Sequence, residues 1–211
     1  MHPEPQASSP TSRIARALLL GAALLGCSAL AGAAAAAFDL AQLAQLLASK
    51  RSGEATFVEK REVSVLDRTV MTSGRLSFEA PDTFVRENLK PSHERVAVVG
   101  NTLTMSRGAN TRSVALDSVP EAAVVIEAIR GTLTGNRESL QRVFDASVAG
   151  SADRWTLDLV PREARLRAQV SSVRVSGRRA EVREIQVVMP DGDRSTMTIE
   201  PTAAAGSGAA R

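Results

Sequence analysis

Alternation of apolar and polar residues from Gly74 to Ala80, followed by a Pro81-Asp82 turn into a second strand, makes Thr72 to Arg86 the stretch that most constrains the fold of this chain. The apolar positions are Gly74, Leu76, Phe78 and Ala80, and the polar positions between them are Arg75, Ser77 and Glu79. Because successive side chains of a β-strand point to opposite sides, this stretch predicts a strand with one apolar face and one wet face. An antiparallel sheet of this kind must cover its apolar face with other elements.

The same two-residue period recurs along most of the chain. It predicts strands over residues 55–65, 72–80, 83–89, 94–99, 102–107, 111–116, 155–159, 170–176, 180–189 and 194–200. Turn sequences separate them, among them residues 66–68, 100–101, 176–178 and 190–193. Strands that follow one another through short loops favour a simple antiparallel meander.

Three segments carry helical spacing instead. The apolar residues of 40–47 follow Asp39, a suitable N-cap, and predict an amphipathic N-terminal helix. Residues 118–121 match a capping box and Gly131 matches a helix end, so we expect a helix between them. A second short helix is expected after Asn136. This helical pair, inserted between two halves of the sheet, is a candidate lid, and the expected fold class is α+β.

The N-terminal segment predicts export from the cytoplasm. Residues 1–37 have two arginines, then an apolar run, then an alanine-rich end at Ala37, which is typical of a secretory signal peptide. We therefore expect one domain over residues 38–201 and a low-complexity, disordered tail over residues 202–211. The domain is long enough for a single core.

One alternative concerns the single cysteine of the chain. Residues 24–27 resemble a lipobox, in which Cys27 becomes the lipidated first residue of the mature protein. The reading that we prefer treats Cys27 as a small apolar residue of the leader, with cleavage near Ala37. Either way, no cysteine remains for a disulfide within the domain.

The residues that usually carry out catalysis are scarce. His93 is the only histidine beyond the leader and lies in an expected loop, so we predict no catalytic triad, no metal site and no cofactor. Asp191 and Asp193 lie in a turn, where aspartate is favoured for backbone reasons. No glycine-rich phosphate loop is present. We therefore expect a binding protein rather than an enzyme.

Arginines are frequent in the C-terminal third of the chain. They are Arg162, Arg165, Arg167, Arg174, Arg178, Arg179 and Arg183. Glutamates are mixed among them, which favours a solvated outer face of the sheet, and the alternative is a surface that docks on anionic headgroups. The net charge of only +3 gives little support for a nucleic-acid partner.

The order and spacing of several short motifs is similar to that of the periplasmic outer-membrane lipoprotein carrier family, the LolA-like proteins. The motifs are Phe57-Val58-Glu59, Gly74-x-Leu76-x-Phe78-x-x-Pro81-x-x-Phe84-x-Arg86, and Val98-Val99-Gly100-x-x-Leu103. The resemblance covers residue 38 to about residue 201 and implies an open antiparallel sheet bent into an incomplete barrel and closed by a helical lid. It further implies a periplasmic monomer that binds acyl chains and carries lipoproteins from an inner-membrane exporter to an outer-membrane receptor, with transient membrane contact.

The resemblance and the alternation together give a candidate acyl-chain cavity. Its expected lining residues are Phe57, Leu76, Phe78, Phe84, Val98, Leu103, Met105, Trp155, Leu157 and Met197, and its expected lid residues are Val125, Ile126 and Ile129. Each of these is also compatible with an ordinary packed core, and the sequence leaves open which parity of each strand faces inward.

Departures from the family pattern keep further alternatives open. Ala80 stands where the family usually has an arginine that latches the lid, and Thr104 and Ser106 stand where aromatic residues are common. The family's last strand and loop have no counterpart after Pro201. A paralogue with a narrower cargo, such as another acylated lipid, is one alternative. A membrane-tethered lipid receptor or a lipid-sensing module that binds a partner protein is another.

Overall fold

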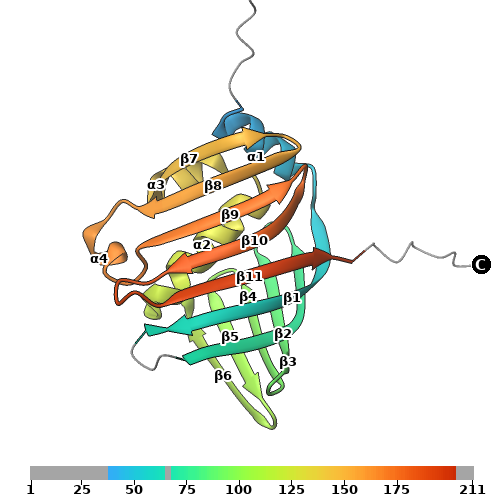
Figure 1. Ribbon diagram of the computed structural model, residues 1–211. Helices are drawn as coiled ribbons and strands as arrows, with labels where there is room; N and C mark the ends of the chain where they lie inside the picture. Colours follow the sequence, from blue (N-terminus) through green and yellow to red (C-terminus); the bar gives the residue numbers. More distant parts are fainter. Residues whose placement is uncertain (1–37, 65–67, 203–211) are drawn as a thin grey trace, which may run out of the picture. The chain divides into compact units, whose positions relative to one another are not determined.

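One eleven-stranded antiparallel sheet organises residues 38–64 and 68–202, which are the residues described by the computed structural model (Figure 1). The strands lie in the order β6-β5-β4-β3-β2-β1-β11-β10-β9-β8-β7. The two ends of this order, β6 and β7, form the edges of an open sheet. The expected α+β fold, built on an open antiparallel sheet with a few helices, is confirmed.

The elements follow one another along the chain with short connections. The strands are β1 (Ser52–Val63), β2 (Arg68–Glu79), β3 (Thr83–Lys90), β4 (Glu94–Val99), β5 (Thr102–Arg107), β6 (Asn110–Ala115), β7 (Phe144–Ser151), β8 (Arg154–Pro161), β9 (Ser172–Arg178), β10 (Glu181–Val188) and β11 (Arg194–Pro201). The helices are α1 (Leu40–Ala48), α2 (Pro120–Leu133), α3 (Arg137–Val143) and α4 (Ala164–Arg167), with a 3-10 turn at Leu116–Ser118. The first and last strands of the chain, β1 and β11, pair in the middle of the sheet.

Burial distinguishes the two faces of the sheet. Phe57 is 2% exposed, whereas its neighbour Val58 is 49% exposed. Phe57 pairs in register with Ile199 of β11 and with Gly74 of β2, so these positions share the inner face. The sequence left open which alternate residues of each strand face inward. The inner face is the one that contains Phe57.

The helices cover this inner face. Leu43 of α1, Val124 of α2 and Leu140 of α3 belong to one core cluster with sheet residues that include Leu157 and Val175. A second, smaller cluster forms under the N-terminal half of α2, where Ile126 packs against Val98, Leu103 and Leu116. The sheet thus buries its apolar face mainly against α1, α2 and α3.

Local sequence signals explain two of the helix starts. Asp39 caps α1, because its side chain accepts a hydrogen bond of 2.8 Å from the backbone N–H of Gln42 and the Gln42 side chain accepts one in return. Asn136 caps α3 by accepting from the backbone N–H of Ser139 over 2.9 Å. Both predicted helices are confirmed.

The predicted ends of the lid helix are wrong at both sides. Ser118 does not cap α2, which begins at Pro120. It lies in the 3-10 turn, where its hydroxyl donates a hydrogen bond of 2.6 Å to the carbonyl oxygen of Ala115. Gly131 does not end α2, which continues to Leu133. Gly131 is instead a packing position, because a Cβ there would lie 2.7 Å from Cδ2 of Leu140.

Two strand predictions also need correction. β7 had no strand range of its own in the prediction, although the two-residue period returns from Phe144 onward, where β7 begins. The predicted turn at residues 176–178 is wrong, because β9 continues to Arg178 and the chain turns at Arg179, where φ is 50°. Gly177 lies inside β9, where a Cβ would meet the Trp155 ring at 2.3 Å.

Several predictions lie outside the described residues. They include the signal peptide with Cys27 and the tail after Thr202. The predicted turn at residues 66–68 is described only at its end, where Arg68 pairs with Val63 to close a hairpin.

Candidate functional site

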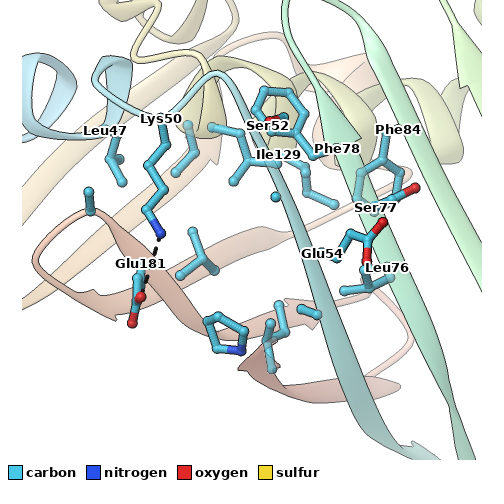
Figure 2. A pocket seen from close by; sticks show the side chains of 18 of the residues that line it. Leu47, Lys50, Ser52, Glu54, Leu76, Ser77, Phe78, Phe84, Ile129 and Glu181 are labelled. Carbon is cyan, nitrogen blue, oxygen red and sulfur yellow. Dashed lines mark ion pairs between the residues drawn. The ribbon is translucent and has the colours of Figure 1, made fainter. Parts of the chain in front are cut away.

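An apolar cavity of about 110 Å³ lies between the helices and the inner face of the sheet (Figure 2). Its sheet side is formed by side chains of the inward parity, namely Ala55, Leu76, Phe78, Phe84, Ile185 and Ile199. Its helix side includes Leu47 of α1 and Ile129 and Leu133 of α2. Such a space offers non-directional contact to an apolar group and few polar partners.

A narrow crevice adjoins this cavity under α2. Its volume is about 10 Å³, and it shares Phe78, Phe84, Ile129 and Leu133 with the cavity. These four side chains, two from the sheet and two from α2, are therefore the common wall of the two spaces.

An ion pair stands beside the cavity. Nζ of Lys50 lies 3.5 Å from Oε1 of Glu181, and Figure 2 shows the two side chains pointing toward each other next to the apolar lining. Burial alone raises the pKa of the Glu181 carboxyl, but the hydrogen bond and charge of Arg183 and the charge of Lys50 hold that pKa below its usual value. The Glu181 side chain is accordingly a carboxylate at neutral pH.

The predicted site residues fall into three groups. Leu76, Phe78, Phe84 and Ile129 line the cavity; Phe57, Trp155, Leu157, Met197 and Val125 belong to the main core or pack against it; and Val98, Leu103 and Ile126 belong to the second cluster. Met105 lies outside all three and is 40% exposed. The cavity therefore contacts only part of the predicted set.

Most residues of the cavity were missed from the sequence. Among the apolar ones are Leu47, Ala55, Leu133, Val175, Val182, Ile185 and Ile199. Strand parity supplies the missing signal for Ala55 and Ile199, which lie two residues from the predicted Phe57 and Met197 and so on the same face. Helical spacing does not distinguish a cavity-lining position from a core position, so it could not identify Leu47 and Leu133. Both lie near the C-terminal ends of their helices.

A hydrogen bond ties α2 to the sheet. At position 80, where the resemblance places a latch arginine, Ala80 contributes its backbone N–H, which donates to the carbonyl oxygen of Arg51 over 2.8 Å. A different arginine, Arg130 of α2, donates through its guanidinium to the carbonyl oxygen of Gly100 over 2.7 Å. Gly100 lies in the turn between β4 and β5, where its φ of 58° suits glycine.

Within residues 38–64 and 68–202, no group of three His, Cys, Asp or Glu side chains is placed to hold a metal ion. His93 is exposed and lies 3.0 Å from Oε1 of Glu87. In the same part of the chain, no helix has the length and apolar character needed to cross a bilayer.

Comparison with solved structures returns distant likenesses over most of the domain. A LolA superfamily protein from Nitrosomonas europaea is 7% identical, with a TM-score of 0.40 and coverage of 77% of this chain and 91% of that chain. A DUF1329 family protein from Desulfovibrio piger is 10% identical, with a TM-score of 0.45 and coverage of 79% and 91%. LprF from Mycobacterium bovis is 10% identical, with a TM-score of 0.34 and coverage of 76% and 91%.

Comparison with protein families is decisive. No curated protein matches the chain. The family described as outer membrane lipoprotein carrier protein LolA-like matches residues 31–211, which includes every described strand and helix. The resemblance drawn from the short motifs is thereby confirmed, and the chain belongs to the outer membrane lipoprotein carrier protein LolA-like family.

Proposed function

We propose that this protein binds the acyl chains of lipoproteins or related lipids beneath α2 and carries them through the periplasm from the inner to the outer membrane. The observation that supports this most is the apolar cavity of about 110 Å³ between the inner face of the sheet and α2. Membership of a family named for lipoprotein carriers adds to it. An exporter and a receptor in the two membranes are the partners that such a role requires.

The size of the cavity means that binding requires opening. A cavity of about 150 Å³ holds a molecule of the size of benzene, and pockets for larger ligands measure about 300–1,000 Å³. The present 110 Å³ is therefore too small for a long acyl chain. Removal of Ile129 and Leu133 from the wall shared with the adjoining crevice supplies the extra space. We therefore assign the lid role to α2.

The lid lowers the net affinity to a useful range. An acyl chain of about 16 carbons in water exposes apolar surface that costs about 12 kcal/mol, at about 0.8 kcal/mol for each CH2. In the closed state Val125, Ile126 and Ile129 are only partly buried against the two clusters. Their contacts are lost when the chain enters, which offsets part of the gain and keeps release possible.

Fluorescence titration with 11-dansylaminoundecanoic acid tests this function. We expect saturable binding to the wild-type protein and its loss in Ile126→Asp, because a carboxylate under α2 disfavours burial of an acyl chain. Val58→Asp, on the exposed outer face of β1, is the matched control and should bind as the wild type does. Far-UV circular dichroism checks that each variant keeps its sheet. Retained binding by a folded Ile126→Asp protein would contradict the lid role.

The alternative is a tethered receptor or lipid-sensing module of the same fold, and the lipobox-like residues 24–27 are the observation that favours it. Intact mass of the exported protein separates the two. A chain that begins at Phe38 supports a carrier that leaves the membrane. A chain that begins at an acylated Cys27 supports the tethered alternative.

A further inference from the structure

Six polar side chains form a connected row on the inner face of the sheet, next to the apolar cavity. We call them the polar strip: Glu59, Arg86, Asn88, Glu94, Arg107 and Ser195. They come from β1, β3, β4, β5 and β11. The register of the paired strands places all six side chains on the same face of the sheet as Phe57.

The strip begins where the apolar lining ends. On β3 the inner face passes from Phe84, which lines the cavity, to Arg86 two residues later. Arg86 pairs in register with Leu76, another cavity residue. Two residues of a strand span about 6.7 Å. The strip therefore begins one residue pair from the apolar lining, within reach of the polar end of a molecule whose apolar part contacts Phe84 and Leu76.

The half of the strip nearest the cavity is a partly buried ion pair. The guanidinium of Arg86 binds the carboxylate of Glu59, and the two side chains are 22% and 16% exposed. Arg86 also donates to Oδ1 of Asn88 over 2.8 Å, and its guanidinium lies 4.7 Å from the centroid of the Phe57 ring. Ser195 donates its hydroxyl to the other oxygen of Glu59.

The far half of the strip repeats the pairing. Glu94 of β4 forms an ion pair with Arg107 of β5 and accepts a hydrogen bond of 3.4 Å from the amide of Asn88. Asn88 thus links the two ion pairs, since it accepts from Arg86 and donates to Glu94.

The charges of the strip cancel. Glu59 and Glu94 balance Arg86 and Arg107, so the strip offers both hydrogen-bond donors and acceptors without a net charge. A phosphate that binds Arg86 must displace the carboxylate of Glu59 or be repelled by it. Hydroxyl and amide groups, in contrast, can donate hydrogen bonds to the carboxylates and accept them from the arginines.

We propose that the polar strip is the head-group site for the amphiphile whose acyl chain enters the cavity, and that it accepts an uncharged hydroxyl- or amide-bearing head in preference to a phosphate. The inference rests on the proposed acyl-chain function. Such a site makes the carrier bind a neutral cargo in preference to anionic phospholipids. The net charge of +3 on the whole chain acts in the opposite direction, because it attracts anions.

Displacement of the fluorescent reporter N-phenyl-1-naphthylamine from the exported protein tests the proposal with three probes of one chain length. They are dodecyl maltoside for hydroxyls, dodecanoyl-diglycine amide for amides, and dodecyl phosphate for the anion, each below its critical micelle concentration. We expect both neutral probes to compete about tenfold or more better than dodecyl phosphate. The stronger of the two neutral probes identifies the source of the head group.

Glu59→Gln provides the decisive variant. Loss of the carboxylate frees Arg86, so dodecyl phosphate should bind about fivefold or more tightly while neither neutral probe gains affinity. Glu87→Gln, one residue beyond Arg86 and on the outer face, is the matched control and should change none of the three probes. Glu94→Gln gives the same direction as Glu59→Gln and serves if Glu59→Gln does not fold.

The outcomes separate this inference from the proposed function. Equal competition by all three probes in the wild type, or equal effects of Glu59→Gln and Glu87→Gln, overturns the head-group site and leaves acyl binding intact. Failure of the wild type to bind the reporter and every probe overturns both.

Discussion

The guanidinium of Arg130 on α2 donates a hydrogen bond of 2.7 Å to the carbonyl oxygen of Gly100 in the turn between β4 and β5. The same guanidinium lies 3.9 Å from Glu127, one turn earlier on the helix. The contact joins the last turn of α2 to the turn between β4 and β5. Ala80 contributes only its backbone N–H to its own contact with Arg51. In this protein, the arginine that joins α2 to the sheet at this point therefore belongs to α2 itself.

Replacement of Arg130 by methionine tests this fastening. The variant keeps most of the apolar stem and loses the hydrogen bond, so we expect a stability loss of about 1 kcal/mol and faster uptake of an acyl reporter. Stopped-flow fluorescence measures the uptake rate and urea unfolding measures the stability. Arg137→Met, at the exposed start of α3, is the control. An unchanged uptake rate in Arg130→Met shows that the contact does not restrain opening.

Truncation of Ile129 to alanine tests the wall between the cavity and its adjoining crevice. The smaller side chain joins the two spaces and removes closed-state contacts, so we expect a loss of about 1–3 kcal/mol in stability together with tighter acyl binding. Calorimetric titration with dodecanoate gives the affinity. Val99→Ala, on the exposed side of β4, is the control. Weaker binding by Ile129→Ala indicates that Ile129 contacts the cargo rather than competing with it.

The close approach of β2 and β3 at Gly74 predicts a sharp difference between two glycines. A Cβ at Gly74 would lie 1.9 Å from the carbonyl oxygen of Glu87, so Gly74→Ala forces the backbones apart and should cost about 2–3 kcal/mol. Gly53 of β1 has no atom within 4 Å of the same position, and Gly53→Ala should be neutral or stabilising by up to about 1 kcal/mol. Urea unfolding compares the two. Equal effects contradict the close approach.

The ion pairs of Glu181 predict a small dependence of stability on pH. The pKa of Glu181 is lower in the folded protein than its usual 4.5, so the carboxylate stabilises the fold above that usual value. The contribution disappears as pH falls through the lowered pKa. Because the side chain is partly exposed, the difference between the wild type and Glu181→Gln at pH 7 should stay below about 1 kcal/mol. The two unfolding curves should converge in acid, and a gap that widens there contradicts the assignment.

Local patterns accounted for much of the fold, because they depend on neighbours in the chain. Alternation separated Phe57 from Val58, and the Asp39 cap marked the start of α1. Signals with a tertiary cause were misread. Gly131 is required by the Leu140 side chain and Gly177 by the Trp155 ring, and neither glycine ends an element.

The site was less accessible from the sequence than the fold. Ala55 and Ile199 meet at the cavity only through the pairing of β1 with β11, the first and last strands of the chain. The bond from Arg130 to Gly100 and the polar strip likewise depend on the positions of separate elements. No spacing within one segment encodes such contacts.

Native mass spectrometry with lipid extraction, on the protein purified from the periplasm of its own host, tests acyl-chain carriage most directly. We predict a chain that begins at Phe38 and carries an acyl lipid or lipopeptide, which is lost in Ile126→Asp. A clean apo-protein that also takes up no acyl probe would contradict the binding of acyl chains beneath α2.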